Sequence, residues 1–254
     1  HSGFALSGDG FTVIMDYYRD SEDGQAQADL NRLMDGTFSN QEAGMPEGTV
    51  HSELLRRPGK LYVLASHFHP DHFNKEVLQW REQRPDIIYI FSKDILRHRR
   101  AQKEDAVWLK KGEEYKDETL SVRAFGSTDV GVSFLLQTGG KKIFHAGDLN
   151  NWHWMDESTE AEWKGAEKNF LHELDDLYAY TPEVDVAMFP VDPRLGKEYM
   201  RGAGQFVTKI KTHIFVPMHF TPEYAKANAF RDFAEAHGVR FVSLTHRGQK
   251  IEIE

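Results

Sequence analysis

Three histidines and one aspartate occur within six residues, in the order His67-Phe68-His69-Pro70-Asp71-His72. They follow Lys60 to Ala65, an apolar run after the turn pair Pro58-Gly59, which is typical of a short buried strand. Side chains two residues apart on an extended segment point to the same side, so His67 and His69 can reach one ion together. Neutral imidazoles and a carboxylate suit zinc, iron, manganese or nickel. The pattern therefore predicts a metal site at the end of this strand.

Asp71 and His72 fall in the turn between this strand and a helix expected over Lys75 to Arg81. Pro70 forbids helix at its own position and biases its neighbour toward extended geometry. The two side chains are thus free to face back toward the first ion or to hold a second one. A bound divalent ion lowers the pKa of its water and polarises a carbonyl or phosphoryl oxygen. Asp71 is placed to orient that water, so we expect it to be the general base.

Two other predicted strand ends offer further ligands, which a pair of ions would need. Asp148 follows the strand Lys142 to His145, and Gly147 before it permits a sharp turn that aims the carboxylate off the sheet. His219 follows the strand His213 to Val216. An aspartate can bridge two ions, and His219 can complete the second one. Considered alone, Asp148 is equally well explained as a turn carboxylate, and His219 better as a core histidine.

Short strands and helices are expected along the rest of the chain. A capping box, Thr159-x-x-Glu162, predicts the start of a long amphipathic helix. Strands in both halves, each followed by helices, fit two packed sheets with helices outside. The further predicted strands are Phe4 to Leu6, Phe11 to Met15, Asp86 to Phe91, Ala106 to Leu109, Leu120 to Phe125, Val132 to Gln137, Val184 to Phe189, Arg240 to Leu244 and Lys250 to Ile253. The further predicted helices lie near Ala26 to Met34, from Ser92, near Lys197 to Ile210 and from Pro222 to His237.

Composition narrows the classes of function. The 254 residues are interpreted as a single domain, 1–254, with an N-terminal strand expected to be missing because the chain opens without Met inside a strand-like segment. The 31 basic and 40 acidic residues are mixed along the chain, which argues against nucleic-acid and membrane partners and favours a small-molecule substrate. With no cysteine there is no thiolate ligand. No run approaches the roughly 18 apolar residues of a membrane span, and no signal peptide is visible, so we expect a cytoplasmic protein. The oligomeric state is not indicated.

The His-x-His-x-Asp-His cluster, Gly147-Asp148 and the later His219 together resemble the metallo-β-lactamase superfamily of hydrolases, over essentially the whole chain. The resemblance implies an α/β fold, a four-layer αβ/βα sandwich. It also implies that His67 and His69 hold one ion, that Asp71 and His72 hold a second, that Asp148 bridges them and that His219 completes the second site. Several segments are more closely similar to the branch typified by the bacterial ascorbate-phosphate lactonase: His1-Ser2-Gly3-Phe4, Val13-Ile14-Met15-Asp16, Phe189-Pro190 and Val216-Pro217-Met218-His219-Phe220.

The function implied by this resemblance is hydrolysis of a small ester, lactone or phosphate-bearing substrate with one or two divalent ions, zinc being the expected one and manganese, iron or nickel the alternatives. Two other functions fit the same cluster. One is a phosphodiesterase or RNA-processing nuclease, which the acidic balance disfavours. The other is a metal-binding sensor without catalysis, because one expected ligand is absent.

The absent ligand is a histidine that this family usually has before the strand Val132 to Leu136, where this chain has Ser127. The first ion would then need water, Asp129, His145 or His153 in its place. We prefer Asp129, since carboxylates bind the same ions.

Three other positions near the predicted ligands have two interpretations each. Asp16, at a strand end, is expected to accept a hydrogen bond from a ligand imidazole. Trp152 and Trp154 could form a wall for substrate or an apolar plug. Arg194 could hold an anionic group of the substrate, although an exposed turn arginine is the simpler interpretation.

Overall fold

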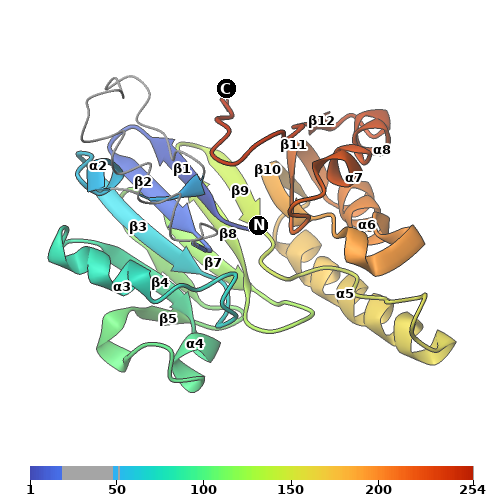
Figure 1. Cartoon of the computed structure of the whole chain (residues 1–254), viewed down its shortest axis with the longest axis horizontal. Helices are drawn as coiled ribbons and strands as arrows, with labels where there is room; N and C mark the ends of the chain where they lie inside the picture. Colours follow the sequence, from blue (N-terminus) through green and yellow to red (C-terminus); the bar gives the residue numbers. More distant parts are fainter. Residues whose placement is uncertain (19–47, 51, 254) are drawn as a thin grey trace.

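Two β-sheets form the framework of the chain, with helices on both outer sides (Figure 1). The computed structural model describes residues 1–18, 48–50 and 52–253. The helix predicted near Ala26 to Met34 lies outside these residues. No helix among the described residues has the length and apolar character that a bilayer span requires.

The first sheet has the strand order β1-β2-β3-β4-β5. The predicted hairpin is present, with β1 antiparallel to β2, whereas β2 to β5 run parallel to one another. Alternate residues of β3 face opposite sides of the sheet: Tyr62 and Leu64 pack toward the second sheet, and Leu61 and Val63 toward the outer helices. The bounds are β1 Phe4–Gly8, β2 Phe11–Met15, β3 Lys60–Ala65, β4 Ile88–Ser92 and β5 Val107–Leu109.

The second sheet has the order β12-β11-β10-β9-β8-β7-β6. Strands β6 to β9 are antiparallel neighbours, and β9 to β12 are parallel. Its bounds are β6 Glu114–Lys116, β7 Ser121–Phe125, β8 Ser133–Thr138, β9 Lys141–His145, β10 Glu183–Pro190, β11 Lys211–Met218 and β12 Arg240–Phe241. β6 has no counterpart among the predicted strands.

Helices cover the outer face of each sheet, which produces four layers (Figure 1). The first sheet carries α2 Ser52–Leu55, α3 Glu76–Gln79, η2 Trp80–Glu82, α4 Lys93–Arg97 and η3 Lys103–Asp105. The second carries α5 Glu160–Tyr180, η4 Pro193–Glu198, α6 Arg201–Lys209, α7 Tyr224–Asn228 and α8 Arg231–Ala236.

The predicted capping box begins α5. The Thr159 side chain accepts a hydrogen bond from the Glu162 amide, and the Glu162 carboxylate accepts one from the Thr159 amide at 2.8 Å. The helix is amphipathic, as predicted, and Phe170, Leu174 and Leu177 on one face are fully buried. The helix is therefore held by its buried stripe rather than by propensity alone.

Three predicted details near the C-terminal end are wrong. The helix Pro222 to His237 is two short helices, and Asn228 at the end of α7 uses its side chain to pair with the backbone of Leu244. Lys250 to Ile253 is not a strand, because no neighbouring strand supplies it with ladder hydrogen bonds. The strand predicted to end at Val216 continues through Pro217 to Met218: β12 pairs with β11 only at Ile214 and Phe215, so no ladder bond to β12 is lost at the proline.

Candidate metal centre

The predicted ligands meet because their strands end at the same edge. Asp16 follows β2 and His67 follows β3, which are parallel; Asp148 follows β9 and His219 follows β11, which belong to the parallel part of the second sheet. In open α/β sheets, sites form at the carboxyl ends of parallel strands. Here two sheets contribute their carboxyl ends to one centre.

A first group of potential ligands consists of His67, His69, Asp129 and Asp148, whose donor atoms all lie within 4.8 Å of one another. His67 Nε2 lies 3.1 Å from His69 Nδ1 and 3.3 Å from Asp148 Oδ2. Asp129 Oδ2 lies 3.5 Å from His69 Nδ1. Donor atoms that share one ion at about 2.1 Å each lie at most about 4 Å apart. The three distances of 3.1, 3.3 and 3.5 Å fall within that limit, so each of these pairs of side chains can share one ion.

Asp129 is the one alternative to the missing histidine that the structure brings to this group. His145 and His153 are both buried, but each has its two ring nitrogens hydrogen-bonded to the backbone. The partners are the Ser2 carbonyl and the Gly147 amide for His145, and the Glu198 carbonyl and the Met155 amide for His153. Neither imidazole has a nitrogen left for an ion. Ser127 contacts Asp129 only through its hydroxyl, which accepts from the Asp129 amide at 3.4 Å.

A second group consists of His1, Asp71, His72 and His219, again within 4.8 Å of one another. Asp71 Oδ2 lies 3.0 Å from His1 Nε2 and 3.7 Å from His72 Nε2. His1 is absent from the ligands expected from the sequence. The segment His1-Ser2-Gly3-Phe4 resembles the lactonase branch, but that resemblance gave His1 no ligand role, and His1 is 66 residues from the nearest histidine of the cluster.

Asp148 lies between the two groups. Its Oδ2 faces His67, whereas its Oδ1 is 3.0 Å from His72 Nε2 and 3.3 Å from His219 Nε2. A carboxylate with one oxygen toward each group is arranged as a bridging ligand would be. The pairing of Asp71 with His72 and His219, and of His67 with His69, matches the grouping that the resemblance implied.

The residues present fit a metal ion, because the buried donor atoms are left without other partners. His72 Nε2, His219 Nε2 and Asp148 Oδ1 have no hydrogen-bond partner among the described residues, although Asp148 Oδ1 lies 3.0 Å from His72 Nε2 and 3.3 Å from His219 Nε2. Leaving a buried polar atom unsatisfied costs about 1–3 kcal/mol. Three such atoms facing one point are explained by an ion that binds all of them.

The outer nitrogens of these imidazoles are held by buried carboxylates. His72 Nδ1 donates to Asp16 at 2.7 Å, and His219 Nδ1 donates to Asp192 at 2.8 Å. These hydrogen bonds assign the proton to Nδ1 and leave the Nε2 lone pair for an ion. Asp16 thus makes the contact expected of it from the sequence.

Asp16 also orients His67, through Ser66. The Ser66 hydroxyl donates to Asp16 at 2.6 Å, so its oxygen accepts from His67 Nδ1 at 2.9 Å. The Ser66 amide donates to the other oxygen of Asp16 at 2.7 Å. One fully buried carboxylate therefore fixes a ligand of each group.

The centre attracts positive charge. Burial disfavours a charged imidazole at His72, but the facing carboxylates of Asp148 and Asp16 raise its pKa to about 10. Burial likewise opposes ionisation of Asp148, yet His219, His67 and His72 hold its pKa below the ordinary value. Without an ion, protons occupy this site, and a metal must displace them.

Two non-glycine residues at the centre have left-handed backbone: Asp16 at φ +45° and His219 at φ +65°. Such conformations cost of order 1–3 kcal/mol and concentrate at functional sites. Gly147, at φ +53°, makes the sharp turn expected before Asp148; a Cβ there would lie 2.9 Å from the Ser66 side chain.

Arg194 and Trp152 both contact His219. The Arg194 guanidinium is held by Asp192, with Nε 3.0 Å from each carboxylate oxygen, and its Nη2 lies 3.2 Å from His219 Nδ1. The Trp152 ring meets the edge of His219 at 5.4 Å and stacks on Trp154, while its indole N–H donates to the Asp148 carbonyl at 2.8 Å. Both indoles are half-buried.

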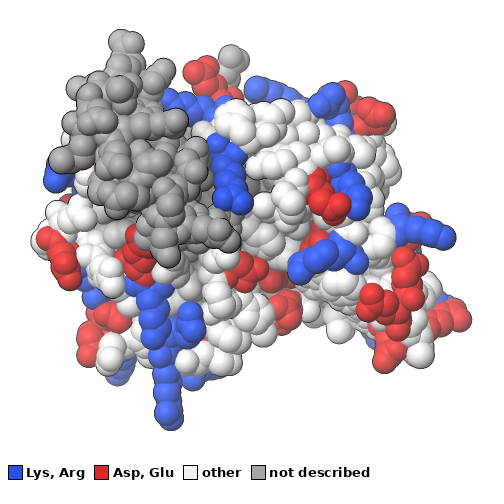
Figure 2. Space-filling model, viewed as in Figure 1, with Lys and Arg blue, Asp and Glu red and all other residues white. Residues whose placement is uncertain are grey.

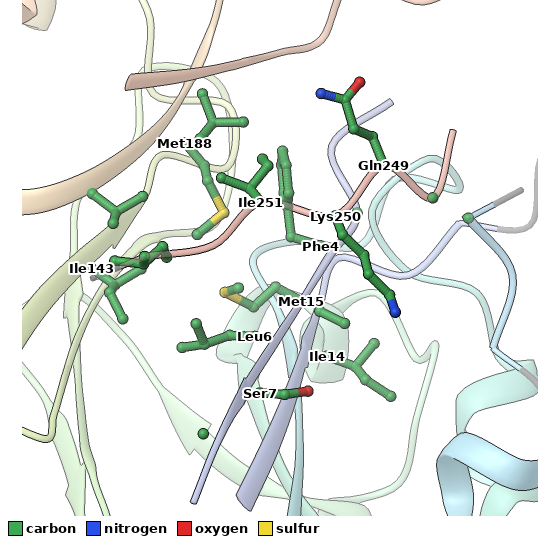
Figure 3. A pocket seen from close by; sticks show the side chains of 18 of the residues that line it. Phe4, Leu6, Ser7, Ile14, Met15, Ile143, Met188, Gln249, Lys250 and Ile251 are labelled. Carbon is green, nitrogen blue, oxygen red and sulfur yellow. The ribbon is translucent and has the colours of Figure 1, made fainter. Parts of the chain in front are cut away.

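A pocket of about 1320 Å³, lined by both apolar and polar side chains, reaches the second group at His1. Figure 3 shows Phe4 and Leu6 of β1, Met15 of β2 and Met188 of β10 around this space, with Ile251 of the C-terminal segment beside them. The second group of ligands therefore meets this pocket at His1, and Trp152 and Arg194 at His219.

Comparisons with known proteins agree with this architecture. Three solved structures share it at 13–15% identity: the metallo hydrolase Igni18 of Ignicoccus hospitalis, the metallo-β-lactamase fold protein YhfI of Bacillus subtilis, and CmlA, a diiron β-hydroxylase of Streptomyces venezuelae. Igni18 is 15% identical with a TM-score of 0.62, over 99% of this chain and 94% of that one. YhfI is 13% identical with a TM-score of 0.58, and the match covers 98% of this chain and 89% of YhfI. CmlA is 14% identical with a TM-score of 0.57, and the match covers 97% of this chain and 52% of CmlA.

No curated protein matches the sequence. Residues 1–167 match the family model described as "Beta-lactamase superfamily domain", which is more than half of the chain. The predicted four-layer sandwich and, at a general level, the predicted metal-dependent hydrolase are confirmed. The chain belongs to the β-lactamase superfamily and has the metallo-β-lactamase fold.

Proposed function

We propose that this protein hydrolyses a small ester, lactone or phosphate-bearing molecule at a two-ion centre. His67, His69, Asp129 and Asp148 would hold one ion, and Asp71, His72, His219 and Asp148 the other. The single observation that carries the proposal is the carboxylate of Asp148, whose two oxygens face separate groups of ligands.

Bound divalent ions supply an activated water and polarise the oxygen of the scissile group. The chain's own contribution is to keep Asp148 ionised and to hold the imidazoles in place through Asp16 and Asp192. Asp71 is suited to a proton-transfer role, because 38% of its side chain is exposed, against 8% for Asp148. A general base must be reached by the proton it takes, so Asp71 is the better candidate.

We infer further that the substrate carries an anionic group. Arg194 keeps its charge at every physiological pH, and 62% of its side chain is exposed although Asp192 fixes its position. It borders His219, as does the ring of Trp152, so an anion and an apolar or ring-shaped portion could be held together beside the ions. Lactones with an anionic group come first, given the similarity of several segments to the lactonase branch.

The surface favours a small substrate over a polyanion. Figure 2 shows Lys and Arg interspersed with Asp and Glu over the described part of this face, without a continuous basic stripe. Nucleic-acid binding depends on such a stripe to neutralise phosphates.

The test is hydrolysis by metal-free protein reloaded with zinc, manganese, iron(II) or nickel, screened against lactones, phosphoesters and carboxylic esters. We expect at least one class to be hydrolysed only by loaded protein. Asp71→Ala should then lower kcat by about 10²–10⁴-fold, as expected for loss of a general base. Activity that persists after complete removal of metal, or no hydrolysis by any loaded form, would contradict the proposal.

Arg194→Met should separate charged from neutral substrates. We expect KM for an anionic substrate to rise about 10–100-fold, the value of one charge-assisted hydrogen bond, with little change for its neutral analogue. Arg194→Lys keeps the charge and should recover part of the loss. Equal effects on both substrates would mean that Arg194 serves only to brace Asp192 and His219.

A further inference from the structure

We propose that His1 is a ligand of the second ion, which would give that site three imidazoles, from His1, His72 and His219, beside the carboxylate of Asp71. The inference rests on the proposed function only in requiring that the centre bind metal.

Backbone contacts fix the segment that carries His1. The His1 carbonyl accepts a hydrogen bond from the His219 amide at 2.9 Å, and the carbonyl of the fully buried Ser2 accepts one from His145 at 2.9 Å. Gly3 follows, where an added Cβ would lie only 3.0 Å from the Asp16 carbonyl. The segment thus packs against three of the loops that form the centre, and its position does not depend on the imidazole.

The His1 side chain points into the second group. Its Nε2 is 3.0 Å from Asp71 Oδ2, and its ring centroid lies 4.1 Å from that of His219 and 5.9 Å from that of His72. Only 17% of the side chain is exposed. The carboxylate of Asp71 explains why His1 turns toward it, but not why the imidazoles of His72 and His219 lie beside His1 as well. A divalent cation accounts for all four side chains.

With His1 as a ligand, the two metal sites differ in the number of side chains that bind the ion. The second site would have four side chains and Asp148 Oδ1, whereas the first has His67, His69, Asp129 and Asp148 Oδ2. Zinc sites usually have four ligands, while manganese and iron accept six nitrogen and oxygen donors. The larger donor set favours manganese or iron at the second site.

The experiment is a metal titration of metal-free protein with Mn²⁺ and with Zn²⁺, using a chromophoric chelator as competitor. Wild type should bind two ions. His1→Ala and His1→Gln should keep one ion and bind the second more than about 10-fold more weakly, since even outer contacts of a ligand are worth that much. His246→Ala, which removes an exposed histidine outside both groups, should behave as wild type.

Melting temperatures of the metal-free proteins show whether the variants fold, which we expect because the backbone bonds of His1 do not involve its side chain. Unchanged affinity for the second ion in both His1 variants would overturn the proposal and leave His1 as a contact that positions Asp71. A wild type that binds only one ion would overturn it as well. A wild type that binds two ions but hydrolyses nothing would refute the proposed function and leave the ligand assignment intact.

Discussion

Asp148→Ala should abolish tight binding of both ions and lower kcat/KM by at least about 10³-fold, the largest effect expected of any single substitution here. Its two oxygens face the two groups of ligands, so its removal takes one donor from each site at once. It also removes the anion that the three facing imidazoles, His67, His72 and His219, share. Elemental analysis after dialysis, together with steady-state kinetics, measures both effects.

The matched control for this substitution is Asp9→Ala, an exposed aspartate in the turn between β1 and β2. It should retain wild-type metal content and activity. If Asp148→Ala lost only one ion, Asp148 would be a ligand of a single site rather than a bridge.

Asp129→Ala should weaken binding of the first ion by more than about 10-fold while the second site keeps its ion. The reason is that Asp129 is the only side chain among the described residues that adds a third partner to His67 and His69 besides the shared Asp148. We expect kcat/KM to fall by about 10²-fold or more, because one of two ions is lost. A metal titration of the metal-free variant counts the ions it binds, and steady-state kinetics at saturating metal then measure the fall in kcat/KM.

Two variants sharpen that test. Asp129→His supplies the imidazole that this family usually has in the same loop, so binding should recover. Ser127→Ala should change nothing, because the Ser127 hydroxyl only accepts a hydrogen bond from the Asp129 amide. Retention of two tightly bound ions by Asp129→Ala would show that water or another group completes the first site.

Local pattern predicted most strands. β3 lies at Lys60–Ala65, as predicted, and β2 at Phe11–Met15, because short apolar runs bounded by glycine and proline turns specify a buried strand without outside help. The prediction for Lys250 to Ile253 had the same kind of pattern but was wrong, since a strand also needs a neighbour. The break between α7 and α8 is likewise tertiary: it coincides with the side chain of Asn228 bonding to Leu244, 16 residues away.

The sequence by itself determined the cluster His67 to His72, because its ligand spacing is set within one strand end and the turn after it. Predicted strand ends suggested Asp148 and His219 as further ligands, and the resemblance supported both and identified Ser127 as the position of the missing histidine. Only the tertiary structure shows which of the candidate side chains lies beside His67 and His69: Asp129 does, whereas both nitrogens of His145 are hydrogen-bonded to the backbone of Ser2 and Gly147. His1 entered the centre in the same way, since the chain folds back to bond the amide of His219. The identity of a ligand depends on which atoms are left without other partners, and that is known only when every partner is in place.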